Sequence, residues 1–228
     1  DFCLSRGLGD VYKRQVGIAS GDVNGDGRLD LVVANYGSDT ISVLAGNGAG
    51  GFAPQAVFPC HPSCDPYAVV LRDFDGDGRL DAATSNLSAA TVSLLRGNGD
   101  GTFGAPAAVS TGFSGNYHLQ AGDLDGDGIT DLAVANYSNS RLIVVKGRGD
   151  GSFDAPAAYP LSGNPIAAEI GDFNQDGRAD IATANHGNAT YAILLGNGVQ
   201  PLAEDPVGSG FRFGTARGNL SLAAGVWD

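Results

Sequence analysis

The sequence has little positive charge. Lysine and arginine together number 13, against 25 aspartates and glutamates, so the formal net charge is −12 at pH 7. Nucleic acids and anionic membrane surfaces are bound through basic faces, so this balance argues against both as partners. No apolar run approaches the roughly 20 residues that a membrane-spanning helix needs. We therefore expect neither nucleic-acid binding nor membrane insertion.

Methionine is absent, tryptophan occurs once, and no segment has a convincing helical period, whereas glycine occurs 36 times. Abundant glycine without a collagen period indicates many turns, and hence many short strands. A chain of 228 residues is long enough to bury a core. The composition predicts an all-β fold.

The first fifteen residues, "DFCLSRGLGDVYKRQ", match nothing further along the chain. They resemble the translated adaptor remnants sometimes found at the ends of environmental sequence assemblies. We predict that residues 1–15 are a sequencing remnant and exclude them from the fold. The alternative is a genuine N-terminal extension.

An acidic phrase recurs four times. It reads "DVNGDGRLD" from Asp22, "DFDGDGRLD" from Asp73, "DLDGDGITD" from Asp123 and "DFNQDGRAD" from Asp172, at intervals of 51, 50 and 49 residues. Each copy precedes an apolar run that ends in asparagine, and then a phrase such as "TISVLAGNG". The first three units close with a Gly, Phe and Pro turn. Such registered repetition indicates a repeat architecture.

Each unit is predicted to form four short strands separated by Gly, Asn and Asp turns, which is the size of one β-propeller blade. The predicted blades are residues 16–65, 66–115, 116–164 and 165–215. The fourth carries about ten extra residues before its Phe, and residues 216–228 resemble the start of a fifth unit. We therefore expect part of a larger propeller.

The acidic phrase has the donor pattern of a cation-binding loop. Oxygen-bearing side chains occupy positions 1, 3, 5 and 9, glycine at position 6 permits a sharp turn, and the position-7 carbonyl adds a backbone oxygen. Calcium accepts six to eight such ligands, whereas magnesium demands a near-regular octahedron. An EF-hand would need a glutamate at position 12, where this chain has Val33, Thr84, Val134 or Thr183. The alternative interpretation is that the Asp-Gly pairs only make turns.

Charge supports the calcium hypothesis. The four phrases hold 3, 4, 4 and 3 carboxylates, which is 14 of the 25 in the chain. Four calcium ions would bring the net charge from −12 to −4. A cation should therefore stabilise the fold by linkage. On carboxylate number, we expect loops two and three to bind more tightly than loops one and four.

The combined motif, Asp-x-Asp/Asn-x-Asp-Gly-x-x-Asp followed by Gly-Asn-Gly, Phe and Pro, resembles the FG-GAP or VCBS repeat. That repeat builds the propeller head of integrin alpha chains and of many bacterial secreted or surface proteins. The resemblance covers about Val16 to Asp228 and implies a propeller of the integrin-alpha N-terminal type. Seven blades are common in this family, so the four units here are the main departure. It also implies about four calcium ions, one in a hairpin loop of each blade.

The predicted calcium ligands share positions 1, 3, 5 and 9 for side chains and position 7 for a backbone oxygen. They are Asp22, Asn24, Asp26, Arg28 and Asp30; Asp73, Asp75, Asp77, Arg79 and Asp81; Asp123, Asp125, Asp127, Ile129 and Asp131; and Asp172, Asn174, Asp176, Arg178 and Asp180.

Cys60 and Cys64 in "PCHPSCDP" are close enough for a small loop disulfide. His61 and Asp65 beside them leave a metal site as the alternative, but the second half of a zinc pattern is missing. We favour the disulfide.

The histidines offer no repeated catalytic group, because His61, His118 and His186 occupy different positions in their units. His186 aligns with Tyr36, Leu87 and Tyr137 just after the strand-ending asparagines, where the four side chains could line one rim. Stacking on sugar rings is one use for such a rim, and packing at blade corners is the other.

These observations predict an extracellular, secreted or cell-surface, calcium-binding module without a catalytic site, which acts as a binding or adhesion scaffold for protein or carbohydrate ligands. Calcium loops with weak affinity suit the high free calcium outside cells. The alternative is the propeller part of a secreted polysaccharide-active enzyme, such as a lyase. That alternative needs a clustered catalytic base on one rim.

Overall fold

The computed structural model describes residues 14–186, 189–196 and 203–204. These residues form sixteen strands in four antiparallel sheets and no helix, so the all-β prediction is confirmed. Within the described ranges there is accordingly no helix that could cross a membrane. The predicted fifth unit at 216–228, and most of the longer loop of the fourth unit, lie outside the described residues.

Blades one and two are four-stranded meanders, in which each strand pairs with the next. Their strands are β1 (Arg14–Gly21), β2 (Asp30–Tyr36), β3 (Thr40–Leu44) and β4 (Ala56–Pro59), then β5 (Pro66–Arg72), β6 (Asp81–Asn86), β7 (Thr91–Leu95) and β8 (Ala107–Ser110). The first strand begins at Arg14, two residues inside the segment predicted to be a remnant.

Blades three and four repeat the same order. Their strands are β9 (Asn116–Gly122), β10 (Asp131–Asn136), β11 (Arg141–Val145) and β12 (Ala157–Pro160), then β13 (Asn164–Gly171), β14 (Asp180–His186), β15 (Thr190–Leu195) and β16 (Ala203–Glu204). The acidic phrases lie between the first and second strands of each blade.

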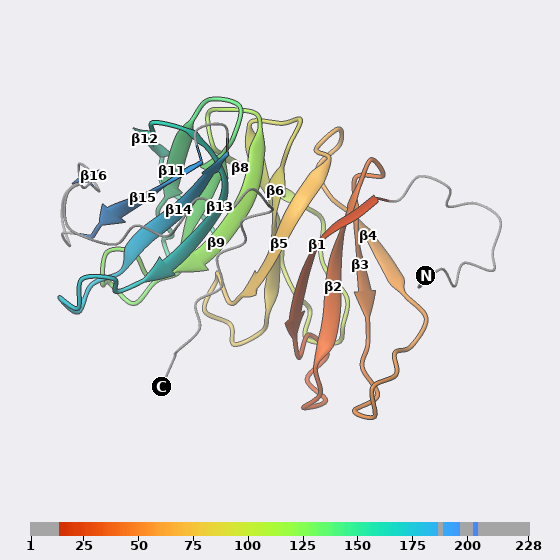
Figure 1. The fold of residues 1–228 in the computed structure, drawn as a ribbon. Coiled ribbons are helices and arrows are strands. Elements are labelled where there is room, and N and C mark those ends of the chain that lie inside the picture. The colour runs from red at the N-terminus through yellow and green to blue at the C-terminus, as the bar shows by residue number, and fades with distance from the viewer. Residues whose placement is uncertain (1–13, 187–188, 197–202, 205–228) are drawn as a thin grey trace.

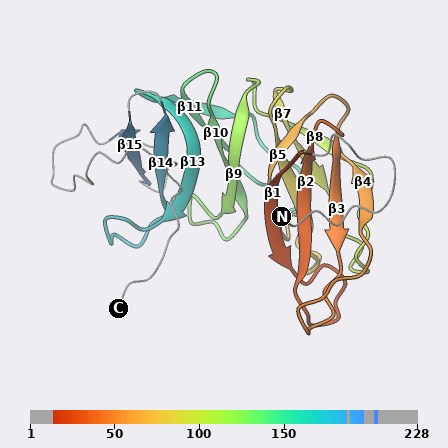
Figure 2. The same cartoon turned by 45° about the vertical axis from the view of Figure 1, so that its right-hand side comes forward.

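The four blades stand in chain order along an open arc, with blade one and blade four at its two ends (Figures 1 and 2). The first strands are neighbours across blade boundaries: β1 contacts β5, β5 contacts β9, and β9 contacts β13. Four-stranded meanders that meet through their first strands are the arrangement of a β-propeller. The predicted blade architecture is therefore confirmed, without closure of the ring.

The second strands of blades two and three are buried on both faces because each lies between two neighbouring blades. Every residue of β6 ("DAATSN") and β10 ("DLAVAN") is buried. Three apolar clusters fill the spaces between blades, and the first joins Val23 of blade one to Leu71 and Phe103 of blade two. Burial on both faces explains why these strands read as continuous apolar or small-residue runs rather than as alternating patterns.

The outer face of blade one is exposed. Ile18 on β1 pairs with Val33, as Val69 pairs with Thr84 in blade two. Ile18 is 64% exposed, whereas Val69 is 5% exposed because blade one packs against it. Blade one therefore presents an apolar position that is covered in the next blade.

Cys60 and Cys64 are buried free thiols, so the expected disulfide is not present in this structure. The interaction between the two thiols lowers the pKa of Cys60 and raises that of Cys64. Asp39 fixes the loop, because its carboxylate accepts backbone N–H bonds from Ser63, Cys64 and Asp65 at 2.8–2.9 Å. Within the described chain, neither cysteine belongs to a group of three or more potential metal ligands.

Candidate metal centre

Each acidic loop turns sharply at the glycine in its sixth position. These glycines have φ of 78° to 83°, in the left-handed region that favours glycine: Gly27, Gly78, Gly128 and Gly177. The predicted role of the glycine is therefore confirmed. At position 4 three loops also have glycine, but loop four has Gln175 at φ 61°, which strains the backbone.

The position-1 aspartate organises the loop around its own carboxylate. Asp22 accepts the N–H of Gly25 at 2.8 Å and of Asp26 at 3.1 Å on one oxygen, and the N–H of Gly27 at 2.7 Å on the other. These bonds, that of Gly27 first, hold the pKa of Asp22 below its usual range. The N–H of the sixth residue is also bound, at 2.8 Å, in the other loops, by Asp73, Asp123 and Asp172.

The position-9 aspartate is buried in every blade. Asp30, Asp81, Asp131 and Asp180 are at most 1% exposed. One oxygen of Asp81 accepts the N–H of Phe74 at 3.0 Å, and the other accepts the N–H of Gly97 at 2.8 Å. The other three aspartates make the equivalent pair of bonds, with Gly46, Gly147 and Gly196 as the distant donors. This carboxylate thus links the acidic loop to a glycine one or two residues after the third strand.

The distant donor has no room for a side chain. A Cβ on Gly97 would lie 2.1 Å from the backbone oxygen of Leu80, and Gly46, Gly147 and Gly196 are equally close to their neighbours, at 2.0–2.2 Å. Sequence analysis missed this contact. The available signal was that each of these glycines follows its aspartate by 16 residues in all four units.

Burial makes two of these carboxylates, Asp81 and Asp131, hard to ionise. Burial raises the pKa of Asp131 to about 6, despite the two backbone N–H donors that act in the other direction. Asp125 and Asp127 add a smaller increase by charge repulsion. Burial likewise raises the pKa of Asp81. In blades two and three, the negative charge at position 9 is therefore incompletely compensated by the protein, which favours a bound cation.

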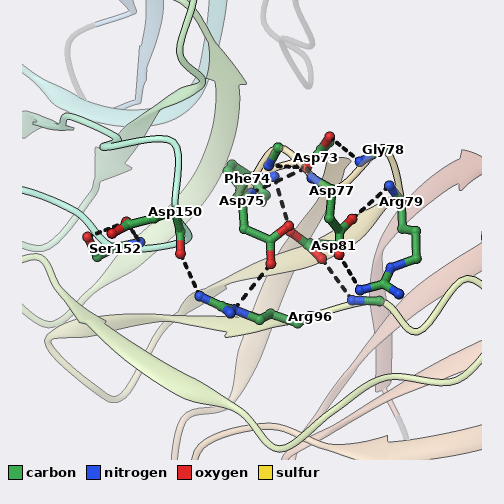
Figure 3. Close-up of polar contacts among 12 residues, drawn as sticks. Asp73, Phe74, Asp75, Asp77, Gly78, Arg79, Asp81, Arg96, Asp150 and Ser152 are labelled. Carbon is green, nitrogen blue, oxygen red and sulfur yellow. Dashed lines mark hydrogen bonds and ion pairs between the residues drawn. The ribbon is translucent and has the colours of Figure 1, made fainter.

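In blades two and three, three of the four predicted side-chain ligands converge. Oxygens of Asp73, Asp75 and Asp81 lie within 4.8 Å of one another, and so do those of Asp123, Asp125 and Asp131. Figure 3 shows the carboxylates of Asp75 and Asp81 pointing toward each other. One carboxylate oxygen of Asp75 is buried without a hydrogen-bond partner. An orphaned buried oxygen among convergent carboxylates fits a hard cation.

The position-5 aspartates lie outside these two clusters. Asp77 accepts the backbone N–H of Arg79 at 2.9 Å, and the Arg79 guanidinium forms an ion pair with its second oxygen. Asp127 accepts the N–H of Ile129 at 2.8 Å. The structure therefore brings positions 1, 3 and 9 together and leaves position 5 at the loop surface.

Blades one and four have asparagine at position 3. Asn24 donates to Asp30 at 3.5 Å, and Asn174 donates to Asp176 at 3.1 Å. The ligand roles of these residues, of Asp26, and of the backbone oxygens of Arg28, Arg79, Ile129 and Arg178 stay predictions.

The acidic loops also lie against the next blade. The N–H of Gly101 in blade two donates to the oxygen of Val23 at 3.0 Å, and Gly151 in blade three donates to Phe74 at 3.0 Å. Both acceptors are position 2 of an acidic loop. A cation held by the loop would therefore stiffen a contact between blades.

A row of aromatic rings lies at the opposite end of the blades. Successive ring centroids are 6.3, 4.5, 4.8 and 6.0 Å apart along Tyr36, Tyr67, Tyr117, Tyr137 and His186. Tyr67 and Tyr117 sit at register shifts near the start of β5 and β9, and such bulges redirect side chains. Of the predicted rim residues, Tyr36, Tyr137 and His186 join this aromatic row. Leu87 does not, and sequence analysis missed the two bulged tyrosines.

The other histidines lie elsewhere. His118 faces the boundary between blades three and four, where its Nδ1 accepts the backbone N–H of Ala168 at 3.3 Å, and burial lowers its pKa. His61 lies in the loop before β5, where its backbone N–H donates to Ser93. The three histidines thus belong to three different environments.

Comparison with known proteins agrees with this geometry. The sequence profile described as "FG-GAP-like repeat" matches residues 22–84, 73–134 and 123–183, which together make up more than half of the chain. The chain belongs to the FG-GAP-like repeat family. No curated protein matches the chain.

Solved structures with the same fold include an Agrocybe aegerita lectin that recognises non-reducing terminal N-acetylglucosamine, at 22% identity and a TM-score of 0.54 over 85% of this chain and 51% of that one. The periplasmic gluconolactonase PpgL of Pseudomonas aeruginosa has 20% identity and a TM-score of 0.60, over 84% and 53%. BBS1N, solved in complex with ARL6DN, has 14% identity and a TM-score of 0.56, over 83% and 55%. The FG-GAP chain spans about half the length of these structures, and the likeness shows the fold alone.

Proposed function

We propose that this chain is a calcium-binding, non-catalytic module of an extracellular protein, in which the loops stiffen the blades and another surface binds a protein or carbohydrate ligand. The observation that carries the proposal is the convergence of Asp73, Asp75 and Asp81 around a buried carboxylate oxygen without a partner, that of Asp75. The counterparts in blade three converge in the same way. Calcium would supply positive charge and six to eight coordination positions.

The protein's own contribution is to hold the donors in place. Backbone N–H groups bind the carboxylates of Asp73 and Asp81 and hold oxygens of the two within 4.8 Å of each other. Because the loop also bonds to the next blade, calcium should raise stability.

The test compares thermal melts in chelator, in about 2 mM calcium and in magnesium at the same concentration. This concentration is on the order of the dissociation constants of the weakest extracellular calcium sites. Calcium should raise the melting temperature by several degrees more than magnesium does. Isothermal titration calorimetry should give affinities of about 10⁻⁴–10⁻³ M, the range of extracellular modules. An unchanged melt would contradict the calcium proposal, and submicromolar affinity would contradict the extracellular one.

The aromatic row is the proposed ligand face. Its four tyrosines are half-buried and His186 is exposed. A hollow of about 450 Å³ lies along the inner strands and includes Tyr67 and Tyr117 in its lining. Aromatic faces beside polar hydroxyls suit sugar rings, and the lectin with the same fold adds plausibility without assigning the ligand.

A glycan array on the wild type, with Tyr67→Ala and Tyr137→Ala as variants, tests this face. Binding that both variants abolish, without release of cleaved product, supports the module. Binding unaffected by either change would place the ligand elsewhere, and cleavage of an acidic polysaccharide would favour the enzymatic alternative.

A further inference from the structure

One position next to the acidic loop is basic in some blades and apolar in others, and the difference matches the number of carboxylates in the loop. This residue immediately precedes the glycine that donates to the position-9 aspartate, so that hydrogen bond, 2.8 Å long in all four blades, holds it beside the loop. It is Ala45, Arg96, Lys146 and Leu195 in blades one to four. We call it the flanking residue.

A basic flanking residue occurs where position 3 is aspartate, and an apolar one where position 3 is asparagine. In blade two, Nε of Arg96 lies 3.5 Å from the carboxylate of Asp75. In blade three, Nζ of Lys146 lies 2.6 Å from the carboxylate of Asp125. Each basic group thus contacts the carboxylate that loops one and four lack.

The flanking cation offsets the fourth carboxylate. Loops two and three carry four carboxylates and one flanking cation, and loops one and four carry three carboxylates and no flanking cation. Position 7 adds an arginine in loops one, two and four, where loop three has Ile129.

Arg96 also bridges two blades. Its Nη2 donates to the backbone oxygen of Asp150 in blade three at 2.6 Å, while its Nε faces Asp75 in blade two (Figure 3). The buried orphan oxygen of Asp75 belongs to the same carboxylate. The flanking cation therefore takes one oxygen of the position-3 carboxylate and leaves the other for a metal.

We propose that Arg96 and Lys146 are built-in counter-ions that stabilise loops two and three without calcium and weaken calcium binding there. The proposal rests on the calcium-binding function proposed above. In loops two and three, calcium must compete with this cation for the position-3 carboxylate, which loops one and four lack, so the extra carboxylate brings no gain in affinity.

The test is Lys146→Ala, with Arg148→Ala as the matched control. Arg148 lies two residues away and pairs with Asp154 rather than with a loop carboxylate, so its removal makes the same change in net charge. Lys146 is 49% exposed, so we expect the variant to fold. Calcium titrations followed by amide NMR would read loop three through Gly128 and loop one through Gly27.

We expect Lys146→Ala to tighten binding at Gly128 roughly three- to tenfold, as removal of a cation near a surface site should. The titration at Gly27 should not change, and Arg148→Ala should match the wild type at both. In chelator, Lys146→Ala should melt below both other proteins. Arg96→Gln should act in the same way on loop two, read at Gly78.

Equal midpoints at Gly128 in the wild type, Lys146→Ala and Arg148→Ala would overturn the counter-ion proposal while leaving calcium binding intact. Weaker binding in Lys146→Ala would also overturn it. If calcium moved neither amide in the wild type, both the proposed function and this inference would fail. The double substitution Asn24→Asp/Ala45→Lys should introduce the same carboxylate–lysine pair into loop one and leave its calcium-binding midpoint close to the wild-type value. Asn24→Asp alone should instead make loop one bind calcium more tightly.

Discussion

Replacement of Asp81 by alanine should destabilise the protein even when no metal is available. The carboxylate of Asp81 is fully buried and accepts the N–H of Phe74 at 3.0 Å and of Gly97 at 2.8 Å. Alanine would leave both donors buried and unpaired. Each unpaired group costs about 1–3 kcal/mol, so the two together cost roughly 2–6 kcal/mol.

One effect acts in the opposite direction. Burial raises the pKa of Asp81, which means that the folded protein disfavours its charged form. Removal of the charge returns part of the loss, so we expect about 2–4 kcal/mol, or roughly 5–15 °C in melting temperature for a chain of this size. Asp81→Asn keeps one acceptor oxygen and should lose about half as much.

The assay is thermal or urea unfolding in excess chelator, with Asp77→Ala as the control. Asp77 belongs to the same loop and removes the same charge, but its oxygens contact Arg79 at the loop surface. Asp77→Ala should therefore melt close to the wild type without metal. If Asp81→Ala melted no lower than Asp77→Ala in chelator, the argument that position 9 is primarily a structural fastening would be wrong.

Three further predictions concern other sites. Burial lowers the pKa of His118, so the unfolded chain binds more protons than the folded one below about pH 6.5, and the melting temperature should fall as pH drops from 7 to 5. His118→Asn keeps an acceptor for the N–H of Ala168 and should make the melting temperature depend less on pH. An unchanged pH dependence in this variant would contradict the assignment to His118. Gln175→Gly should stabilise loop four by about 0.5 kcal/mol in chelator, because relief of the left-handed strain exceeds the entropy cost of glycine; a lower melting temperature would refute this. Ile18→Ser should reduce self-association, measured by sedimentation velocity, without lowering the melting temperature, because the Ile18 side chain is 64% exposed. Self-association equal to that of the wild type would show that the exposed face of blade one does not mediate it.

The repeat pattern predicted the fold because each blade is built from local signals. Turn residues at regular spacing and short apolar runs specify four strands, and the glycine at position 6 does adopt the left-handed turn. The contact between Asp81 and Gly97 was not predicted, because it joins two phrases that were interpreted separately. Its physical cause is the approach of Gly97 to the backbone oxygen of Leu80, which no local propensity expresses.

Counting carboxylates and locating their neighbours lead to different predictions of affinity. The sequence placed a fourth carboxylate in loops two and three and from it predicted tighter binding. Arg96 and Lys146 lie about twenty residues along the chain from the carboxylates that they contact. The pairing of β6 with β7 and of β10 with β11 brings each basic residue back beside its loop. The counter-ion proposal therefore predicts no gain in affinity from the fourth carboxylate, and the NMR titrations decide between the two predictions.

The two ends of the blades differ in how much they vary, and this bears on where specificity lies. At one end, the loops keep the same hydrogen bonds in all four blades. At the other, the bulged position of the first strand holds Val16, Tyr67, Tyr117 and Ile166 in successive blades. A position that tolerates both aliphatic and aromatic side chains is not fixed by the fold. Tyrosine in the two middle blades therefore carries information that the repeat itself does not require, and substitutions there should alter ligand binding while leaving the response to calcium unchanged.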